Sequence, residues 1–264
     1  MQNTRLTTPD EINKMSKETP VILITGGSRG IGRAIALRAA HAGYDVAITY
    51  VEDSSAAEDV LAKIKLAGRK GYARQCDASA ESSEISALIN DVSSAIGPVT
   101  YLVNNVGIIG RIGMLVDLPE DILRESFDVN VIGTILGCKI RAARWIADGV
   151  PGSIVNISSI AATLGAPNEY VHYAASNAAI EAFSIGLSKE LGPHDIRVNV
   201  VSPGTTQTEI HARGGDPGRP ERVSARVPLG RVGEPDEIAA AVMWLHSSEP
   251  SYATGATVRI GGGL

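Results

Sequence analysis

The sequence TGGSRGIG, residues 25–32, stands between an apolar run and a segment of helical periodicity. Its glycines form the pattern GxxxGxG. Glycines let a backbone approach a pyrophosphate closely, and the start of a helix offers that anion free N–H groups and the positive end of the helix dipole. A tight structural turn is the alternative interpretation of the loop alone. Its place after a first strand favours a dinucleotide-binding loop, with these contacting residues: Gly26, Ser28, Arg29, Gly30, Ile31 and Gly32.

The rest of the chain alternates between apolar, β-rich runs and segments of helical periodicity. We expect strands at residues 21–25, 45–50, 70–75, 99–104, 152–157, 196–201 and 256–260. Helices are expected near residues 30–42, 55–67, 81–96, 119–147, 170–191 and 235–246. Continuously apolar strands separated by helices predict an α/β fold of the Rossmann type, a doubly wound parallel sheet of about seven strands with helices on both faces. Ligands of such sheets bind at the carboxyl ends of the strands.

Two segments depart from this alternation. Residues 1–20 are polar and mixed in charge, and we expect a tail that precedes a single domain spanning residues 21–264. Residues 207–235 are rich in glycine, proline and arginine, which is typical of a mobile cover over a site. An ordinary surface loop is the alternative for this second segment.

Composition excludes several classes of function. The chain has 264 residues and a net charge of −5, without a dense stripe of Lys and Arg, so nucleic acid is not expected as a partner. No apolar run is long enough for a signal peptide or a membrane span, and we expect a cytoplasmic protein without membrane contact. The two cysteines and five histidines show no metal-binding spacing, so no metal site is expected.

The residue at the end of the second expected strand helps to distinguish NAD(H) from NADP(H). A carboxylate there would accept hydrogen bonds from an adenosine ribose and repel a 2′-phosphate. The strand ends instead at Tyr50, and Glu52 and Asp53 follow only after the turn. Arg29 in the glycine loop can reach the same place and bind phosphate through its planar guanidinium. The sequence therefore favours NADP(H) over NAD(H), and a solvated Arg29 would leave NAD(H) open.

Several motifs in order along the chain carry a family resemblance. They are TGGSRGIG at 25–32, CDA at 76–78, NNVG at 104–107, NISS at 156–159, Tyr173 and SPG at 202–204. Together they resemble the short-chain dehydrogenase/reductases, and in particular the bacterial oxidoreductases related to sugar dehydrogenases and 3-oxoacyl-carrier-protein reductases. The resemblance covers the chain from residue 21 to its end. It implies hydride transfer between a nicotinamide cofactor and a small-molecule carbonyl or alcohol.

The resemblance also implies individual roles around the cofactor. Asp77, followed by Ala78, resembles the residue that hydrogen-bonds the adenine, and Asn104 with Gly107 resembles the segment that lines the ribose. In the family, the segment PGxxxT contacts the nicotinamide end of the cofactor. The matching positions here are Pro203, Gly204 and Thr208.

Three catalytic residues follow from the same resemblance. Tyr173 matches the proton donor and acceptor, Asn130 the asparagine that holds a water through its backbone, and Ser159 the substrate-orienting serine. Ser158 competes with Ser159, which precedes Tyr173 by 14 residues, one more than is usual in the family. Tyr170 competes with Tyr173, but Tyr173 has the family's YAAS context.

One position departs from the family. Asn177 stands four residues after Tyr173. At this position the family has a lysine that binds the nicotinamide ribose and lowers the pKa of the tyrosine. An asparagine can hydrogen-bond the ribose but carries no charge. At about 4 Å and an effective dielectric constant of about 20, a unit charge pair is worth roughly 4 kcal/mol, near three decades of rate.

Two functions therefore remain open from the sequence. The first is an NADP(H)-dependent oxidoreductase of the short-chain type whose activity is lowered by Asn177. The second is a catalytically inactive nucleotide-binding protein that acts as a sensor or scaffold. The family resemblance further implies a homotetramer, or a homodimer, with helices 119–147 and 170–191 pairing across a two-fold axis and the C-terminal strand making a second contact.

Overall fold

The computed structural model describes residues 19–264, so most of the expected polar tail lies outside the described residues. Seven parallel strands form one sheet in the order β3-β2-β1-β4-β5-β6-β7. Their bounds are Val21–Ile24 (β1), Asp45–Tyr50 (β2), Gly71–Gln75 (β3), Val99–Asn104 (β4), Gly152–Ile157 (β5), Ile196–Pro203 (β6) and Thr257–Ile260 (β7). The predicted doubly wound sheet is confirmed. The strand order reverses between β1 and β4, which is where ligands bind in such sheets.

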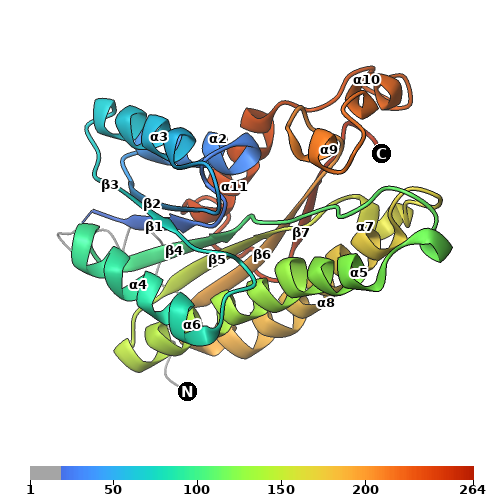
Figure 1. The fold of residues 1–264 in the computed structure, drawn as a ribbon. Coiled ribbons are helices and arrows are strands. Elements are labelled where there is room, and N and C mark those ends of the chain that lie inside the picture. The colour runs from blue at the N-terminus through green and yellow to red at the C-terminus, as the bar shows by residue number, and fades with distance from the viewer. Residues whose placement is uncertain (1–18) are drawn as a thin grey trace.

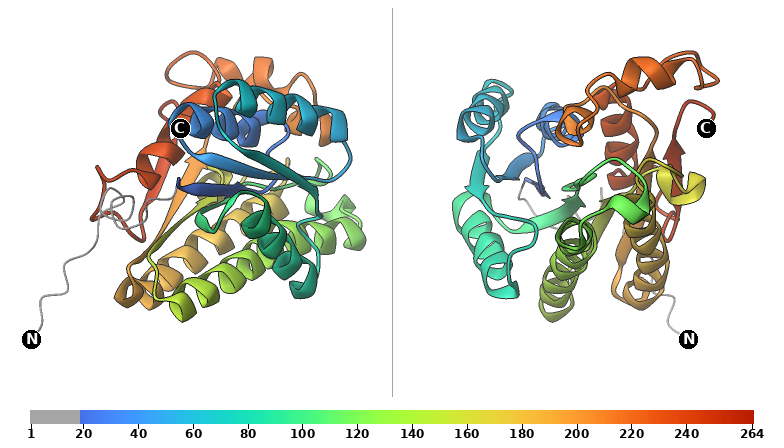
Figure 2. Two further views of the ribbon diagram at one scale, coloured as in Figure 1. Left: turned by 90° about the vertical axis from the view of Figure 1, so that its left-hand side faces the viewer. Right: turned by 45° about the vertical axis from the view of Figure 1, so that its right-hand side comes forward.

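Helices cover both faces of the sheet, as Figures 1 and 2 show. One face carries α2 (Gly30–His41), α3 (Ser54–Leu66) and α11 (Pro235–His246). The other carries α4 (Ser82–Ile96), α6 (Thr134–Asp148) and α8 (Val171–Leu191). The strands lie between two apolar cores, which explains why the inner strands are continuously hydrophobic. None of the described helices is both long and apolar enough to cross a membrane.

The prediction of one continuous helix at residues 119–147 is wrong in one respect. It is divided into α5 (Glu120–Phe127), the π-helical turn η2 (Asp128–Gly133) and α6. Close packing accompanies the irregular turn, because a Cβ at Gly133 would lie 2.1 Å from the carbonyl oxygen of Ala78. Such π-helical turns are frequent at functional sites, and sequence periodicity does not reveal them.

Four short helices lie at the carboxyl end of the sheet: η1 (Leu115–Asp117), α7 (Ala161–Leu164), and, within the predicted cover, α9 (Ile210–Arg213) and α10 (Arg219–Ser224). A fifth, η3 (Gly192–His194), directly precedes β6 at the opposite end. Thr206 and Gly233 form a parallel bridge, so the intervening segment leaves and rejoins the sheet end at one point. In Figure 1 this segment lies at the carboxyl end of the sheet, on the opposite side from α5 and α7.

Candidate active site

A cavity of about 1170 Å³ lies at the carboxyl ends of β1, β4, β5 and β6. Its wall is formed by the glycine loop, the loops that follow these strands, the start of α8 and the segment with α9 and α10. The expected site residues that line it are Gly26, Ser28, Arg29, Gly30, Ile31, Tyr50, Asp77, Gly107, Asn130, Ser159, Tyr173, Asn177, Pro203, Gly204 and Thr208. Parallel strands thus bring together residues that are up to 182 positions apart, from Gly26 to Thr208.

The glycine loop has the shape that a phosphate group needs. Gly26 and Gly30 have φ values of +65° and +51°, in the left-handed region that favours glycine. A Cβ at Gly26 would lie 2.9 Å from a methyl carbon of Val106. Arg29 precedes α2 without capping it through its side chain, and the first turn holds no acidic residue, so the helix start is open to an anion. The loop therefore fits the pyrophosphate of a dinucleotide.

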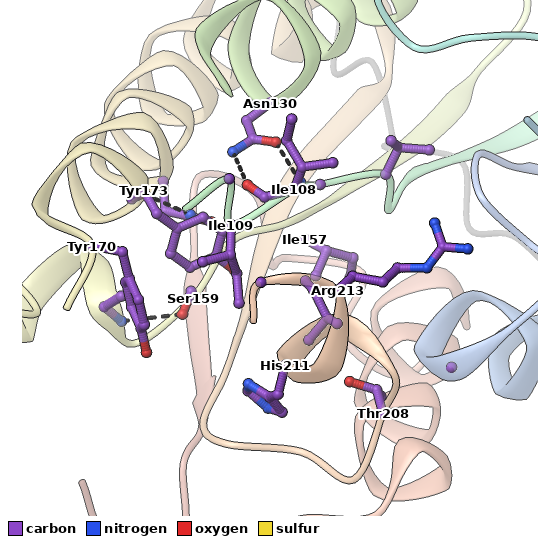
Figure 3. A pocket seen from close by; sticks show the side chains of 18 of the residues that line it. Ile108, Ile109, Asn130, Ile157, Ser159, Tyr170, Tyr173, Thr208, His211 and Arg213 are labelled. Carbon is purple, nitrogen blue, oxygen red and sulfur yellow. Dashed lines mark hydrogen bonds between the residues drawn. The ribbon is translucent and has the colours of Figure 1, made fainter. Parts of the chain in front are cut away.

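Two arginines face the end of β2. Arg29 and Arg213 both line the cavity there with Tyr50, and Figure 3 shows Arg213 extending from α9 toward the glycine loop. Burial lowers the pKa of Arg29, and the positive charge of Arg213 lowers it further. Glu52 lies 3.6 Å from Arg213, in an exposed pair. A bound anion would relieve the repulsion between the two guanidinium groups.

Ser159 and Tyr173 meet on the other side of the cavity (Figure 3). The Ser159 hydroxyl accepts a hydrogen bond from the Ala161 N–H at 3.2 Å. Burial raises the pKa of Tyr173, while the hydroxyl of Ser159 and the amide of Asn177 act in the opposite direction. Ser158 is turned away, because its hydroxyl donates to Glu181 Oε1 at 2.9 Å. The arrangement places Ser159, rather than Ser158, beside the phenol.

Tyr170 packs against the ring of Tyr173. The two rings pack edge to face, with centroids 5.4 Å apart and an interplanar angle of 88°. Tyr170 also lies under the Arg219 guanidinium, whose Cζ is 5.1 Å from the ring centroid. Burial raises the pKa of Tyr170 well above its usual range. Its phenol is therefore neutral in the physiological pH range.

Asn177 is buried beside Tyr173 on the same helix. Its Nδ2 donates to the Tyr173 carbonyl oxygen at 2.8 Å, one turn earlier in α8. In the described part of the chain, no lysine lines the cavity, and its cationic side chains are arginines. Among these, Arg219 contributes a small lowering of the pKa of Tyr173.

Asn130 connects the π-helical turn to the loop after β4. Its Oδ1 accepts from the Ile108 N–H at 2.8 Å, and its Nδ2 donates to the Ile108 carbonyl oxygen at 2.9 Å. The same Nδ2 lies 3.1 Å from the Ser176 hydroxyl of α8. The side chain thus has a structural task, which leaves the irregular backbone of η2 at the cavity wall.

Three of the expected cofactor residues lie behind the wall of the cavity. Asn104 donates through Nδ2 to Asn156 Oδ1 at 2.8 Å, in a buried pair that joins β4 to β5. Ala78 packs its carbonyl against Gly133. A Cβ at Gly32 would lie 2.2 Å from the Gly26 carbonyl oxygen, so this glycine lets α2 approach the loop. These residues shape the site from behind.

The cavity is also lined by polar residues outside the expected set, among them Glu169, His211, Arg213 and Arg219. The last three come from the segment 207–235, whose composition marks a cover but does not place individual side chains. Arg219 Nη2 lies 2.8 Å from Glu169 Oε2 and connects the cover to the start of α8. The residues that the structure describes contain no group of three or more potential metal ligands.

Comparisons with known proteins agree with this geometry. The sequence model of a family described as enoyl-(acyl carrier protein) reductase matches residues 26–264. The uncharacterized oxidoreductase YgfF of Escherichia coli K12 is 42% identical over 245 residues, which are 92% of this chain and 99% of the relative.

Solved structures give the same assignment. A short-chain type dehydrogenase/reductase from Mycobacterium marinum superposes with a TM-score of 0.87 and 30% identity, covering 96% of this chain and 98% of that one. A blue fluorescent protein from a metagenomic library, solved in complex with NADPH, has a TM-score of 0.84 and 32% identity, covering 93% of this chain and 98% of that one. The chain belongs to the short-chain dehydrogenase/reductase family of oxidoreductases.

Proposed function

We propose that the protein is an NADP(H)-dependent oxidoreductase that interconverts a carbonyl and an alcohol of a small-molecule substrate. The observation that carries this proposal is that one cavity is lined by the glycine loop at one end and by Ser159 and Tyr173 at the other. A carbonyl held beside this pair would lie within the same cavity as a nucleotide on the loop. The overall reaction converts carbonyl, NADPH and a proton into alcohol and NADP⁺.

The glycine loop would hold the pyrophosphate, and Asp77, Gly107, Pro203, Gly204 and Thr208 would line the remainder of the cofactor. Bound NADP(H) supplies or accepts a hydride at C4 of its nicotinamide. Asn177 would hydrogen-bond the nicotinamide ribose, and its Nδ2 already donates to the Tyr173 carbonyl. Gly26 and Gly30 support this assignment, because their positive φ values favour glycine and side chains there would crowd Val106 and Thr208 at the wall of the site.

Tyr173 would exchange the proton with the substrate oxygen, and Ser159 would hydrogen-bond the same oxygen. Because burial raises the pKa of Tyr173, its phenol is protonated at neutral pH. A protonated phenol can donate to a carbonyl that is being reduced. Oxidation of an alcohol needs the phenolate and therefore needs alkaline pH. The site thus favours reduction near neutrality.

The preference for NADP(H) over NAD(H) rests on Arg29 and Arg213, which face the end of β2 where Tyr50 replaces a carboxylate. We expect calorimetry to give at least about tenfold tighter binding of NADPH than of NADH, or roughly 1.4 kcal/mol. Arg29→Leu and Arg213→Leu should each weaken NADPH while leaving NADH almost unchanged. Arg124→Leu, on the exposed surface of α5, is the matched control. Equal affinities of the unchanged protein for the two nucleotides would refute the preference.

Asn177 also supports the alternative of a catalytically inactive, nucleotide-binding sensor or scaffold. In the family, a positive charge at this position lowers the pKa of the catalytic tyrosine. Asn177 carries no charge and cannot lower the pKa of Tyr173 in that way. The two functions are separated by turnover of activated ketones and diketones, since both predict nucleotide binding and only the first predicts alcohol product. The intact arrangement of Ser159 and Tyr173 favours the enzyme.

A homotetramer, or a homodimer, in the cytoplasm is the proposed working form. Ile132 and Ile185 are 47% and 44% exposed on η2 and α8, which suits a helix-to-helix contact between subunits. β7 lies at the edge of the sheet, where a second contact would form. Neither a nucleic acid nor a membrane is proposed as a partner.

A further inference from the structure

Arg213 belongs to the cover, residues 207–235, but its side chain reaches the nucleotide end of the cavity. It is the last residue of α9, and Figure 3 shows it extending toward the glycine loop. Among the described residues its ion-pair partner is Glu52, whose Oε2 lies 3.6 Å from Arg213 Nη2, and both side chains are exposed. A long, exposed pair does little to fix either group. The charge contact between α9 and the core of the protein is therefore weak.

Arg29 adds a second positive charge at the same place. Burial lowers the pKa of Arg29, and the charge of Arg213 acts in the same direction. Three carboxylates, those of Glu209, Glu52 and Asp53, offset this effect only in part. A phosphate between the two guanidinium groups would bind both and would connect the cover to the glycine loop.

The other end of the cover contacts the reacting side of the cavity. Arg219, at the start of α10, pairs through Nη2 with Glu169 Oε2 at 2.8 Å, and its Cζ lies 5.1 Å from the centroid of the Tyr170 ring. Tyr170 in turn packs edge to face on Tyr173, with centroids 5.4 Å apart. A displacement of α10 would therefore change the contacts of the ring that packs on the Tyr173 phenol.

The two ends of the cover are closely connected. Arg213 and Arg219 are six positions apart. Between them, the Asp216 N–H donates to the His211 carbonyl oxygen at 2.9 Å, and the Arg219 N–H donates to the Asp216 carbonyl oxygen at 3.2 Å. Backbone hydrogen bonds thus join α9 to α10, so that the position of one helix affects the position of the other.

We propose that Arg213 lets the 2′-phosphate of NADP(H) hold the cover in place, and that the cover in turn positions Tyr170 beside Tyr173. This inference rests on the proposed function, because it concerns the cofactor of that same site. A ligand shifts a conformational equilibrium through contacts that it makes in one state only, and the contact with Arg213 exists only while α9 is in place. NAD(H), with a hydroxyl group instead of the phosphate, would leave Arg213 in its weak pair with Glu52.

Two isomeric fragments of the cofactor separate this effect from any contact of the nicotinamide, which neither of them contains. Adenosine 2′,5′-bisphosphate carries the 2′-phosphate, whereas adenosine 5′-diphosphate carries both phosphates at the 5′ position. Hydrogen–deuterium exchange is measured by mass spectrometry on the protein saturated with each fragment. We expect amides of residues 209–226 to exchange at least about tenfold more slowly with the 2′,5′ isomer, and amides of residues 166–173 to slow as well.

Substitutions locate the effect at Arg213. Each variant is saturated with ligand, so that a lower affinity is not mistaken for a change in the cover. Arg213→Leu should show the same exchange with both isomers, and Arg213→Lys, which keeps the charge, should restore part of the difference. Arg29→Leu is the matched control: this arginine also faces the end of β2 but belongs to the glycine loop, so the difference should persist.

Arg219→Met tests the connection to the reacting end. It should keep the slower exchange of residues 209–214 with the 2′,5′ isomer and lose the slower exchange of residues 166–173, because the contacts with Glu169 and Tyr170 are removed. Thermal unfolding verifies that each variant is folded.

The inference is overturned if the cover exchanges equally with the two isomers, if the difference survives in Arg213→Leu, or if it disappears in Arg29→Leu. Failure of the proposed function gives a different result. A nucleotide-binding protein without catalysis would show the same exchange differences, because no part of the test needs turnover. Equal affinities for NADPH and NADH would refute the cofactor preference, and a difference in exchange between the isomers would still support the positioning role of Arg213.

Discussion

At the scale of single residues, the site pairs a half-buried phenol with an uncharged neighbour. Burial raises the pKa of Tyr173 above the usual value, and Asn177 opposes this shift with an amide instead of an ammonium group. The Asn177 side chain is folded back onto the Tyr173 carbonyl, so it does not extend as a lysine would. The chemistry of position 177 could be predicted from the sequence. The conformation of its side chain could not.

Asn177→Lys is expected to raise kcat for alcohol oxidation at neutral pH by up to about three decades, the Coulomb limit for one added charge near the phenol. An ammonium group lowers the pKa of Tyr173, so the rise of the oxidation rate with pH should move to lower pH. Ketone reduction needs the protonated phenol and should change less. Steady-state kinetics across pH measures both directions.

Tyr173→Phe in the Asn177→Lys background is the control for this change, and it should remove most of the gain because the added charge acts through the phenol. Rapid oxidation by the unchanged protein at neutral pH would contradict the account, since another group would then supply the charge. Arg219 would be the first residue to test in that case, because its charge already lowers the pKa of Tyr173 slightly.

His246 should make the folded protein sensitive to acid. Burial, with the charge of Arg197, lowers the pKa of His246 to about 3, whereas the unfolded chain has the ordinary value of about 6.5. Below that ordinary value the unfolded state takes up a proton that the native state refuses, so stability is lost as pH falls from about 6.5 toward 3. Between pH 7 and pH 5 this residue should cost about 2 kcal/mol of unfolding free energy.

Urea unfolding of the unchanged protein and of His246→Gln is measured at pH 7 and at pH 5. The contribution of His246 is the amount by which the loss of unfolding free energy between the two pH values differs between the two proteins. The variant should lose about 2 kcal/mol less on acidification. His41→Gln on the exposed end of α2 is the matched histidine control. Identical losses in the protein and both variants would show that His246 titrates normally in the native state.

At the scale of elements, the strands could be predicted because buried parallel strands are continuously apolar. Their bounds agree with expectation to within one residue, except that β6 ends two residues later. The helix boundaries within residues 119–147 could not be predicted, because η2 keeps the helical direction of the chain. The local sequence pattern does not predict α9 and α10 either. Their placement depends on contacts such as Arg219 with Glu169, which are 50 residues apart.

Gly152 shows how tightly two elements pack. A Cβ there would lie 2.6 Å from ring carbons of Trp145, so β5 can approach α6 only because this residue has no side chain. Gly152→Ala should therefore destabilise the protein by about 1–3 kcal/mol through overpacking. Gly218→Ala is the control, since nothing lies within 4 Å of a Cβ at this exposed position and its change should stay within about 0.5 kcal/mol. Denaturant unfolding measures both, and equal effects would contradict the packing argument.

At the scale of the whole molecule, the apolar surface divides between the core and the outside. Phe183 packs against the sheet-facing core, and Ile135 is half-buried. Ile132 and Ile185 remain exposed on neighbouring helical segments. The sequence alone does not separate the core-facing side chains of these helices from the exposed ones, because the division depends on how the helices pack on the sheet.

Light scattering at micromolar concentration should give two or four times the chain mass of 27.6 kDa. Ile185→Asp should shift the protein toward the monomer, because a charge would be buried at the helix-to-helix contact. Leu66→Asp is the matched control, since Leu66 is 87% exposed on α3 and lies outside the proposed contacts. A monomer of the unchanged protein would refute the proposed assembly.

The central claim, hydride transfer at this cavity, is tested most directly by following the hydride itself. NADPH carrying deuterium at both C4 positions of its nicotinamide is incubated with an activated diketone, and the product is analysed by mass spectrometry. We predict an alcohol with deuterium on its new carbinol carbon, formed by the unchanged protein at neutral pH and lost in Tyr173→Phe. Tight binding of NADPH without labelled alcohol, from both the unchanged protein and Asn177→Lys, would contradict the claim and favour a nucleotide-binding protein without catalysis.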